Sequence, residues 1–292
     1  MNLEGCHLSI TVVIAVKNEA INLPRCLESL ALAERVVLVD SGSTDNTAGV
    51  AKKYGAEVLQ FNFQGGYPKK RQWALDTLQI TSQWTLLLDA DEVIPPSLWE
   101  EIGQSISRYP VKEGFFITKG FHFLGRKMRY GGFSHSAILL FRTGKARFEK
   151  IFSDSADGLD MEVHERLLVE GEIGRINSPL IHEDFKGLEA YISKHNKYST
   201  WEAELRYRYL MTGKYGVDTI EPNLLGNPQE CRRALKSLIM RVPFESSLWF
   251  CYHYFIRLGF LEGRVGLIAC QIRATYISCV RAKMYELGLN RK

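Results

Sequence analysis

The sequence predicts an α/β fold, in which a mostly parallel sheet is flanked by helices and followed by a helical extension. Short apolar runs, rich in β-branched residues or leucine, alternate with helical patterns through the first half of the chain. Such runs are typical of strands buried on both faces of a parallel sheet. Clusters of turn and capping residues separate them, and acidic residues follow two of the runs directly. Repeated strand–helix–strand units of this kind form a doubly wound sheet.

Four strands are expected in the first half, at residues 9–16, 35–40, 57–61 and 84–88. The helix after the first strand should have Asn22 as its N-cap and Pro24 in its first turn. Further helices are expected to end near Tyr54 and to span residues 68–78 and 97–107. Ligands of such sheets bind beyond the carboxyl ends of the strands, where Asp40 and Asp89 are expected.

The second half has a different pattern. Aromatic strands at 115–118 and 137–141 are joined by glycine-rich turns, and helices follow at 187–210 and after Asn227. The segment 213–228 is rich in Gly, Pro and Asn, as expected of a linker. We therefore expect a main domain over residues 1–212 and a helical extension over residues 213–292.

Composition limits the class of protein. The 292 residues are 46% hydrophobic and 24% charged, as in an ordinary globular protein. The six cysteines are dispersed, without the spacing of a zinc site, which favours a reducing compartment. We expect neither a secretory signal peptide at the N-terminus nor a transmembrane segment, since no apolar run reaches about 18 residues.

The charge is unevenly distributed. The net charge is +4, but residues 231–292 contain 11 Lys/Arg and 3 Asp/Glu, a net of +8, which leaves −4 for the rest. Five aromatic residues lie among these arginines: Trp249, Phe250, Tyr252, Tyr254 and Phe255. A helix of this composition suits anionic lipid headgroups, and a helical pair that packs on the main domain is the alternative; both can hold. No recognised nucleic-acid-binding motif accompanies the charge, so nucleic acid is not expected as a partner.

Three acids follow the fourth expected strand, in the segment Leu88-Asp89-Ala90-Asp91-Glu92. Side chains two residues apart on an extended backbone point the same way, so Asp89 and Asp91 can address one ligand. Carboxylates suit a divalent cation such as Mg²⁺ or Mn²⁺, which bridges two phosphates. The alternative is a solvated acidic turn.

Another acidic cluster, Asp40-Ser41-Gly42-Ser43-Thr44-Asp45, follows the second strand. Its acid can accept a hydrogen bond from a nucleobase, and its backbone amides can meet a sugar or phosphate. Ser43 and Asp45 could instead only cap a helix. The cluster is not a GxGxxG loop, which disfavours a dinucleotide site.

These motifs, together with Val16-Lys17-Asn18-Glu19, resemble the successive signatures of family 2 inverting glycosyltransferases. The closer resemblance is to the branch that includes lipopolysaccharide-core β-1,4-glucosyltransferases. It extends from about residue 8 to residue 285 and includes three later segments: Val163-His164-Glu165, Ile181-His182 and residues 259–266. The resemblance implies a GT-A (Rossmann-like) fold.

The resemblance also implies residue roles. Glu19 and Asp40 would hold the nucleoside, Asp89 would bind near the ribose, and Asp91 would coordinate the metal. Lys70 and Arg71 lie where the family often has an arginine facing the donor, and a cation there suits a diphosphate; a solvated helix start is the alternative for Lys69 and Lys70. The remaining expected nucleotide-sugar-binding residues are Val16, Asn18, Ser41, Gly42 and Ala90.

An inverting transfer needs a base that removes the proton of the acceptor hydroxyl. Glu165 is the first candidate, because it lies in a segment similar to the family's "HE" signature, although it could simply pair with Arg166 or Arg142. Asp184 is the second candidate, because more distant relatives have an acidic pair before a helix. His182 could be a further metal ligand or a structural histidine.

The resemblance predicts an inverting transfer from a nucleoside-diphosphate sugar, with a UDP-sugar favoured. The acceptor would be a hydroxyl of a lipopolysaccharide, lipid-linked or other cell-surface glycan. The enzyme would work at the cytoplasmic face of the cell membrane, as a peripheral protein. One segment departs from the family pattern: residues 121–136 lack the usual proline and acid, and Arg142 follows Phe141. Sugar specificity is therefore not transferred from the glucosyltransferases.

Two other functions are compatible with an acid-lined sheet. A sugar-1-phosphate nucleotidyltransferase would need a glycine-rich N-terminal loop with a lysine, and residues 15–19 contain no glycine. A non-catalytic carbohydrate-binding or membrane scaffold is disfavoured because Asp40, Asp89 and Asp91 are all present.

Overall fold

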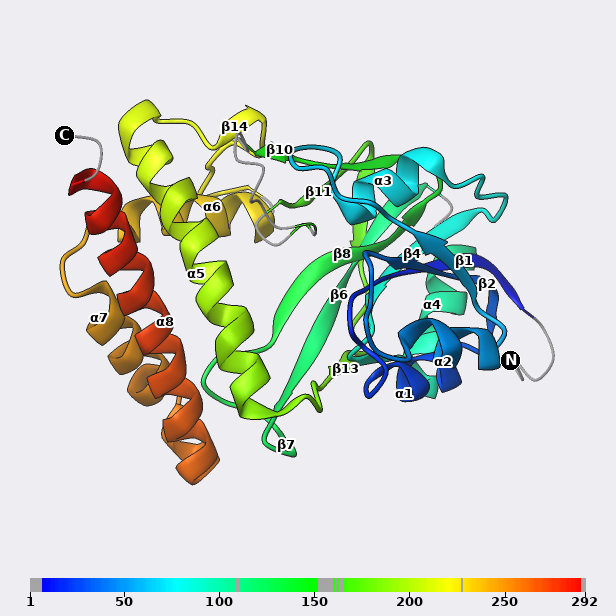
Figure 1. Cartoon of the computed structure of the whole chain (residues 1–292), viewed down its shortest axis with the longest axis horizontal. Coiled ribbons are helices and arrows are strands. Elements are labelled where there is room, and N and C mark those ends of the chain that lie inside the picture. The colour runs from blue at the N-terminus through cyan, green and yellow to red at the C-terminus, as the bar shows by residue number, and fades with distance from the viewer. Residues whose placement is uncertain are drawn as a thin grey trace.

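The computed structural model describes residues 7–108, 111–151, 160, 162, 165–226 and 228–289. Within these residues, ten strands form one mixed sheet, which helices flank, and the C-terminal helices stand at one side of it (Figure 1). The sheet follows the order β3-β2-β1-β4-β8-β6-β13-β5, and β12 and β7 also pair with β6. Its strands are β1 (Leu8–Val16), β2 (Ala33–Asp40), β3 (Glu57–Gln60), β4 (Trp84–Asp89), β5 (Glu92–Val93), β6 (Lys112–Phe123), β7 (Arg126–Lys127), β8 (His135–Arg142), β12 (Glu172–Arg175) and β13 (Leu180–His182).

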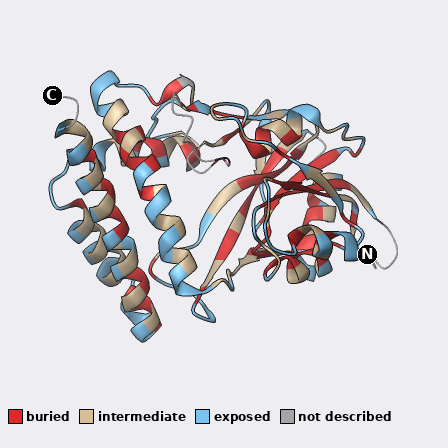
Figure 2. Cartoon of the chain, viewed as in Figure 1, coloured by how far each residue is buried: buried red, intermediate tan, exposed pale blue. Residues whose placement is uncertain are grey.

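The first four strands are parallel, as predicted. Helices α1 (Leu23–Glu28), α2 (Thr47–Lys53) and α3 (Lys70–Thr77) provide the crossovers, and α4 (Pro96–Arg108) follows β5. Alternate residues of β1 enter two different cores: Val12 and Ile14 pack on one face of the sheet and Val13 on the other. Burial on both faces explains why these strands are continuous apolar runs (Figure 2).

The sheet becomes mixed beyond β4. Strand β8 is antiparallel to both β4 and β6, whereas β13 is parallel to β6 and antiparallel to β5. The register of β13 places His182 beside Phe121 of β6 and Glu92 of β5. This arrangement brings a residue from late in the chain to the acidic segment after β4.

Two small sheets adjoin the main one. Strand β9 (Ala146–Phe148) pairs with β11 (Leu167–Val169), and β10 (Lys150–Ile151) pairs with β14 (Gly216–Asp218). The predicted linker thus contributes the short strand β14. Nearby, Glu149, between β9 and β10, is buried and accepts hydrogen bonds from Arg233, which anchors the C-terminal part to the two small sheets.

The C-terminal part is helical, as predicted. It consists of α5 (Gly187–Thr212), α6 (Pro228–Ile239), α7 (Glu245–Cys251), a π-helix η1 (Tyr252–Ile256), a 3₁₀ turn η2 (Gly259–Glu262) and α8 (Gly263–Leu289). Helix α8 packs along α5 through Tyr276, Ile277 and Val280 (Figure 1). Arg206 of α5 is buried between Glu202 and Glu245 and so fixes α7 to α5. The boundary at residue 212 remains a prediction. No described helix is both long and apolar enough to cross a bilayer.

Candidate active site

The carboxyl ends of β1, β2 and β4 meet at one edge of the sheet. Val16 pairs with Asp40 across the β1–β2 register, and Ala15 pairs with Asp89 across β1–β4. Asp40 is buried and accepts hydrogen bonds from the Ser43 amide (3.0 Å) and hydroxyl (2.6 Å). The carboxylate at the end of β2 is therefore fixed by the loop that follows it.

The loop after β1 is locked to the loop after β2. Asn18, at φ +55°, accepts a hydrogen bond from the Thr44 amide (2.7 Å), and the Glu19 amide donates to the Thr47 hydroxyl (2.8 Å). The Glu19 side chain is largely buried, and burial raises the pKa of its carboxyl group even though Lys186 pairs with it. The two predicted nucleoside-binding acids, Glu19 and Asp40, thus lie on adjoining loops.

Asn22 does not cap α1 through its side chain, contrary to the prediction. Its amide nitrogen donates to Glu19 Oε2 and to Asp184 Oδ1, both at 2.9 Å, and its Oδ1 accepts from the Phe185 amide at 2.9 Å. The buried side chain therefore bonds to the preceding loop and to a segment more than 160 residues away, instead of to the helix start. It holds Asp184 against the loop that carries Glu19.

Asp89 is paired with two cations. One carboxylate oxygen contacts Arg71, and the other lies 2.9 Å from Lys119 Nζ, which is also 2.6 Å from Glu92 Oε1. Burial opposes the charge of Asp89, but Arg71 and Lys119 outweigh it and hold the pKa of Asp89 well below its ordinary value. Burial likewise opposes the charge of Lys119, and the two carboxylates raise its pKa. A compact group of two acids and two cations thus lies at the end of β4.

Lys119 was not among the predicted site residues. One feature of the sequence could have identified it. Lys119 is a single lysine within the aromatic strand Phe115–Phe123, where a charge is costly unless it is paired.

Asp91 and His182 lie side by side. His182 Nε2 is 3.3 Å from Asp91 Oδ2, and the Glu183 amide donates to the Asp91 carbonyl oxygen at 2.9 Å. Burial opposes charge on both side chains, but each stabilises the charge of the other, so the pKa of Asp91 is lowered and that of His182 is raised. Within the described residues, His182 Nδ1 is buried without a hydrogen-bond partner.

The Asp91–His182 pair fits a divalent cation that also takes ligands from its substrate. Two ligand atoms on one small cation lie about 3 Å apart when each bond is about 2.1 Å long. Among the described residues, no group of three or more His, Cys, Asp or Glu side chains is arranged to hold a metal. Mg²⁺ usually takes one or two protein ligands and completes its shell with phosphate oxygens and water. The pair suits that kind of site.

The lysines at the start of α3 are buried, so a solvated helix start is wrong for both. Lys70 Nζ donates to the Val16 carbonyl oxygen (2.9 Å) and lies 3.2 Å from Asp160 Oδ2. Lys69 Nζ lies 2.5 Å from Glu165 Oε1 and 4.3 Å from the centre of the Trp201 ring. Lys70 thus joins β1 to α3.

The two candidate bases have different surroundings. The Glu165 side chain is buried and ion-paired with Lys69; Val163 and His164 of its motif lie outside the described residues. Asp184 accepts hydrogen bonds from Asn22 and from the Lys186 amide (3.0 Å). Only one residue separates it from His182. The structure therefore groups Asp184, and not Glu165, with the side chains of Asp91, His182 and Glu19.

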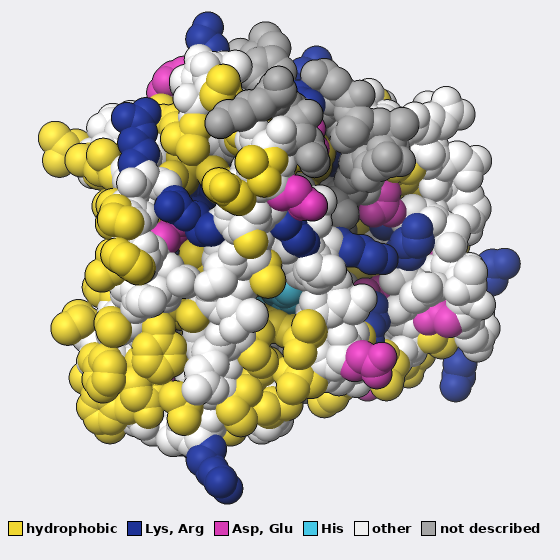
Figure 3. All heavy atoms as spheres, turned by 60° about the vertical axis from the view of Figure 1, so that its left-hand side comes forward, with side chains coloured by type: hydrophobic (Ala, Val, Ile, Leu, Met, Phe, Trp, Pro, Cys, Tyr) yellow, Lys and Arg dark blue, Asp and Glu magenta, His cyan; other side chains and the backbone are white. Residues whose placement is uncertain are grey.

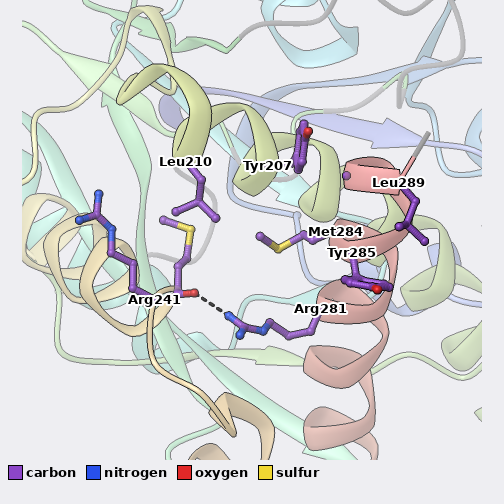
Figure 4. A pocket seen from close by; sticks show the side chains of 9 residues that line it. Tyr207, Leu210, Arg241, Arg281, Met284, Tyr285 and Leu289 are labelled. Atoms are coloured by element: carbon purple, nitrogen blue, oxygen red, sulfur yellow. Dashed lines mark hydrogen bonds between the residues drawn. The ribbon is translucent and has the colours of Figure 1, made fainter. Parts of the chain in front are cut away.

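A separate groove of about 650 Å³ lies between α5, the end of α6 and the C-terminal half of α8 (Figure 4). Arg281 Nη1 crosses it to donate to the Met240 carbonyl oxygen at 2.6 Å. Its lining residues are Tyr207, Leu210, Met240, Arg241, Arg281, Met284, Tyr285, Gly288 and Leu289. The groove thus shares no residue with the acidic strand edge.

The fold and this strand edge define an α/β enzyme whose ligand site lies beyond the carboxyl ends of its parallel strands. Residues 11–149 match the model of the family "Glycosyl transferase family 2", and this part of the chain belongs to that family. The chain is therefore a glycosyltransferase, and the predicted family and GT-A fold are confirmed. The nucleotidyltransferase and scaffold alternatives do not agree with this result.

Curated relatives match nearly the whole chain. The lipopolysaccharide core biosynthesis glycosyltransferase LpsC of Rhizobium meliloti (strain 1021) is 26% identical over 289 residues, which cover 96% of this chain and 93% of that protein. An uncharacterized glycosyltransferase of Rickettsia bellii (strain RML369-C) is 24% identical and covers 96% of this chain and 87% of its own length. The chain is thus similar to one lipopolysaccharide core enzyme over 96% of its length.

Solved structures are more distant. S. aureus TarS (residues 1–349) aligns with a TM-score of 0.41 and 17% identity over 91% of this chain and 89% of that one. Glucosyl-3-phosphoglycerate synthase from Mycobacterium tuberculosis, in complex with Mn²⁺, UDP and glucosyl-3-phosphoglycerate, aligns with a TM-score of 0.32 and 21% identity. That alignment covers 42% of this chain and 46% of the synthase.

Proposed function

We propose that this glycosyltransferase moves a sugar, with inversion, from a nucleoside-diphosphate sugar to a hydroxyl of a lipopolysaccharide or other lipid-linked glycan. A UDP-sugar is the favoured donor. The observation that carries the proposal is the convergence of Glu19, Asp40, Asp89 and Asp91 at one strand edge, beside two buried cations. The similarity of the whole chain to a lipopolysaccharide core enzyme supports the acceptor class.

The donor would lie across the ends of β1, β2 and β4. Asp40 and Glu19 would accept hydrogen bonds from the nucleoside, and Arg71 and Lys119 would turn toward the diphosphate, since guanidinium and ammonium groups bind phosphate oxygens well. Asp91 and His182 would hold Mg²⁺ or Mn²⁺. When bound, the cation neutralises the negative charge that develops on the departing diphosphate.

Inversion needs a base on the face of the sugar opposite the diphosphate. We assign this role to Asp184, because it lies two residues from His182, which contacts Asp91, and is held in place by Asn22. As the acceptor oxygen attacks the anomeric carbon, its proton passes to the Asp184 carboxylate and the bond to the diphosphate breaks. Glu165 remains the alternative base, and its ion pair with Lys69 argues for a structural role.

The proposal also places the enzyme at the cytoplasmic face of the cell membrane, as a peripheral protein. The net charge of +8 in residues 231–292 supports this location, because basic segments are attracted to anionic lipid headgroups.

Calorimetric titration with UDP, GDP, ADP and CDP, each with and without Mn²⁺, tests the donor assignment. We expect UDP to bind at least tenfold more tightly with Mn²⁺ than without it, because the cation joins the diphosphate to Asp91 and His182. Equal and weak binding of all four nucleotides in the presence of Mn²⁺ would contradict the proposed donor site.

Lys119→Met should lower the free energy of unfolding by about 3 kcal/mol, because it leaves buried Glu92 without its cation. Lys112→Met is the matched control on the same strand. Lys112 pairs with Glu172, whose side chain is largely exposed, so this change should cost under about 1 kcal/mol. Urea unfolding measures both effects, and equal losses would contradict the role given to Lys119.

A further inference from the structure

The segment formed by η1, η2 and the two residues between them exposes an unusual amount of apolar surface. Six large side chains there are between 41% and 71% exposed, and we call them the apolar tip: Tyr252, Phe255, Ile256, Leu258, Phe260 and Leu261. Burying such side chains is strongly favourable, and a soluble surface rarely groups so many. In Figure 3, which brings the helical side forward, hydrophobic side chains gather over the lower left part of the surface.

A second segment lies against the apolar tip. The loop at residues 124–131, which contains β7, is joined to it by hydrogen bonds from the Gly131 amide to the Arg257 carbonyl (2.8 Å) and between His253 Nδ1 and the Gly131 carbonyl (2.6 Å). Glu262 accepts from the amides of Arg129 and Tyr130 at 2.5 and 2.7 Å. Two parts of the chain that are more than 120 residues apart thus form one surface.

The free charge of this surface is positive. Five basic residues on the two segments are exposed: Arg126, Lys127, Arg129, Arg257 and Arg264. Glu262 is the only acidic residue within 121–136 and 252–264. It is 2% exposed and paired with Arg126 at 3.2 Å, so it offsets that one cation and leaves the other four basic residues to give the surface its positive charge.

The backbone of the apolar tip is strained at one residue that is itself partly exposed. Leu258 has φ +60°, a conformation that is unfavourable for a residue with a Cβ atom, and yet its side chain is 41% exposed. The preceding turn is a π-helix, a form that is rare and often found at functional sites. The strained residue thus leaves an apolar side chain at the surface and not in the core.

From these observations we infer that the apolar tip and the loop 124–131 together form a docking surface for an anionic lipid bilayer. Apolar side chains would enter the boundary between headgroups and acyl chains, and the surrounding basic side chains would contact lipid phosphates. A second copy of the chain is a poorer occupant. A twofold contact would place the basic residues of one tip against the same residues of its partner, and such like-charge contacts are costly.

The docking surface is connected to the candidate active site. Phe133, next to the loop, stacks on Phe121 with ring centres 6.0 Å apart, and the Phe121 ring meets His182 edge-on at 5.8 Å. Docking would therefore bring the surroundings of His182 close to the bilayer, where a lipid-linked acceptor would lie. This step rests on the proposed function, which assigns a lipid-linked acceptor.

Sedimentation of the full-length chain with lipid vesicles tests the inference. We expect vesicles of phosphatidylcholine and phosphatidylglycerol to bind at least tenfold more protein than phosphatidylcholine alone, with a loss of binding at high salt.

Phe255→Ser/Ile256→Ser should reduce binding at least tenfold, because both side chains are mostly exposed and lose only their contact with lipid. Lys127→Glu/Arg264→Glu should reduce it similarly. Leu225→Ser, at a side chain 97% exposed elsewhere, is the matched control and should bind as the wild type does.

Equal binding to both kinds of vesicle, or unchanged binding by both double variants, would overturn the inference. So would the absence of vesicle binding together with self-association that Phe255→Ser/Ile256→Ser abolishes, which would assign the surface to a second copy. UDP binding, measured in parallel, separates this result from the proposed function. The docking variants should retain it, and failure of the donor assignment would leave vesicle binding intact.

Discussion

Asp91→Asn should abolish the cation-dependent part of UDP binding and reduce sugar transfer about 10³-fold or more. The substitution removes the carboxylate that would hold the cation while it keeps nearly the same shape. Stabilisation of a leaving diphosphate by a cation is worth several kcal/mol, and about 4 kcal/mol corresponds to a thousandfold change in rate. Calorimetry with UDP and Mn²⁺, and a transfer assay with a UDP-sugar, measure the two effects.

Asp76→Asn is the matched control for this experiment. Asp76 is an exposed acid on α3 that accepts a hydrogen bond from Gln72 and lies outside the strand-edge cluster. Asp76→Asn should leave both UDP binding and sugar transfer within about twofold of the wild type. Cation-dependent UDP binding that survives in Asp91→Asn would mean that the cation, if required, is held elsewhere.

Asp184→Asn should reduce kcat by about 10² to 10⁴ while cation-dependent UDP binding is retained. This is the range expected for loss of a general base. Steady-state kinetics, with UDP binding measured on the same preparation, distinguish loss of the base from loss of the donor site.

Glu165→Gln is the comparison, because both carboxylates were candidates from the sequence. We expect kcat to change less than about tenfold, since Glu165 is buried against Lys69. The opposite pattern, with the large loss of kcat in Glu165→Gln and little change in Asp184→Asn, would reassign the base to Glu165.

The proposed nucleoside-binding acid Glu19 and the proposed base Asp184 are connected by Asn22. This amide hydrogen-bonds to Glu19 and to Asp184, so the proposed nucleoside-binding loop and the proposed base share one rigid support. Lys186, two residues after Asp184, also pairs with Glu19. The position of the base relative to the donor is thus set by a few buried polar contacts. Such contacts are strong in the interior because each group would be costly to leave unsatisfied.

The sequence by itself determined the parallel half of the sheet and the acids at its edge. Strands such as β1 and β4 are buried on both faces, so their apolar runs are visible locally, and parallel pairing brings Asp40 and Asp89 to the same edge. The helical C-terminal part was visible for a similar reason, because helical periodicity and capping residues are local features.

Only the tertiary structure decided which polar groups meet. Asn22 had the sequence context of an N-cap, but its side chain binds residues more than 160 positions away. Lys119 stands alone in its strand, and its pairing with Asp89 and Glu92 depends on how β6 lies in the mixed half of the sheet. Glu165 pairs with Lys69, a partner that the sequence did not suggest. The physical reason is that a charged or polar side chain in a loop takes the partner that packing brings near, and a contact between distant segments leaves no periodic pattern in the chain.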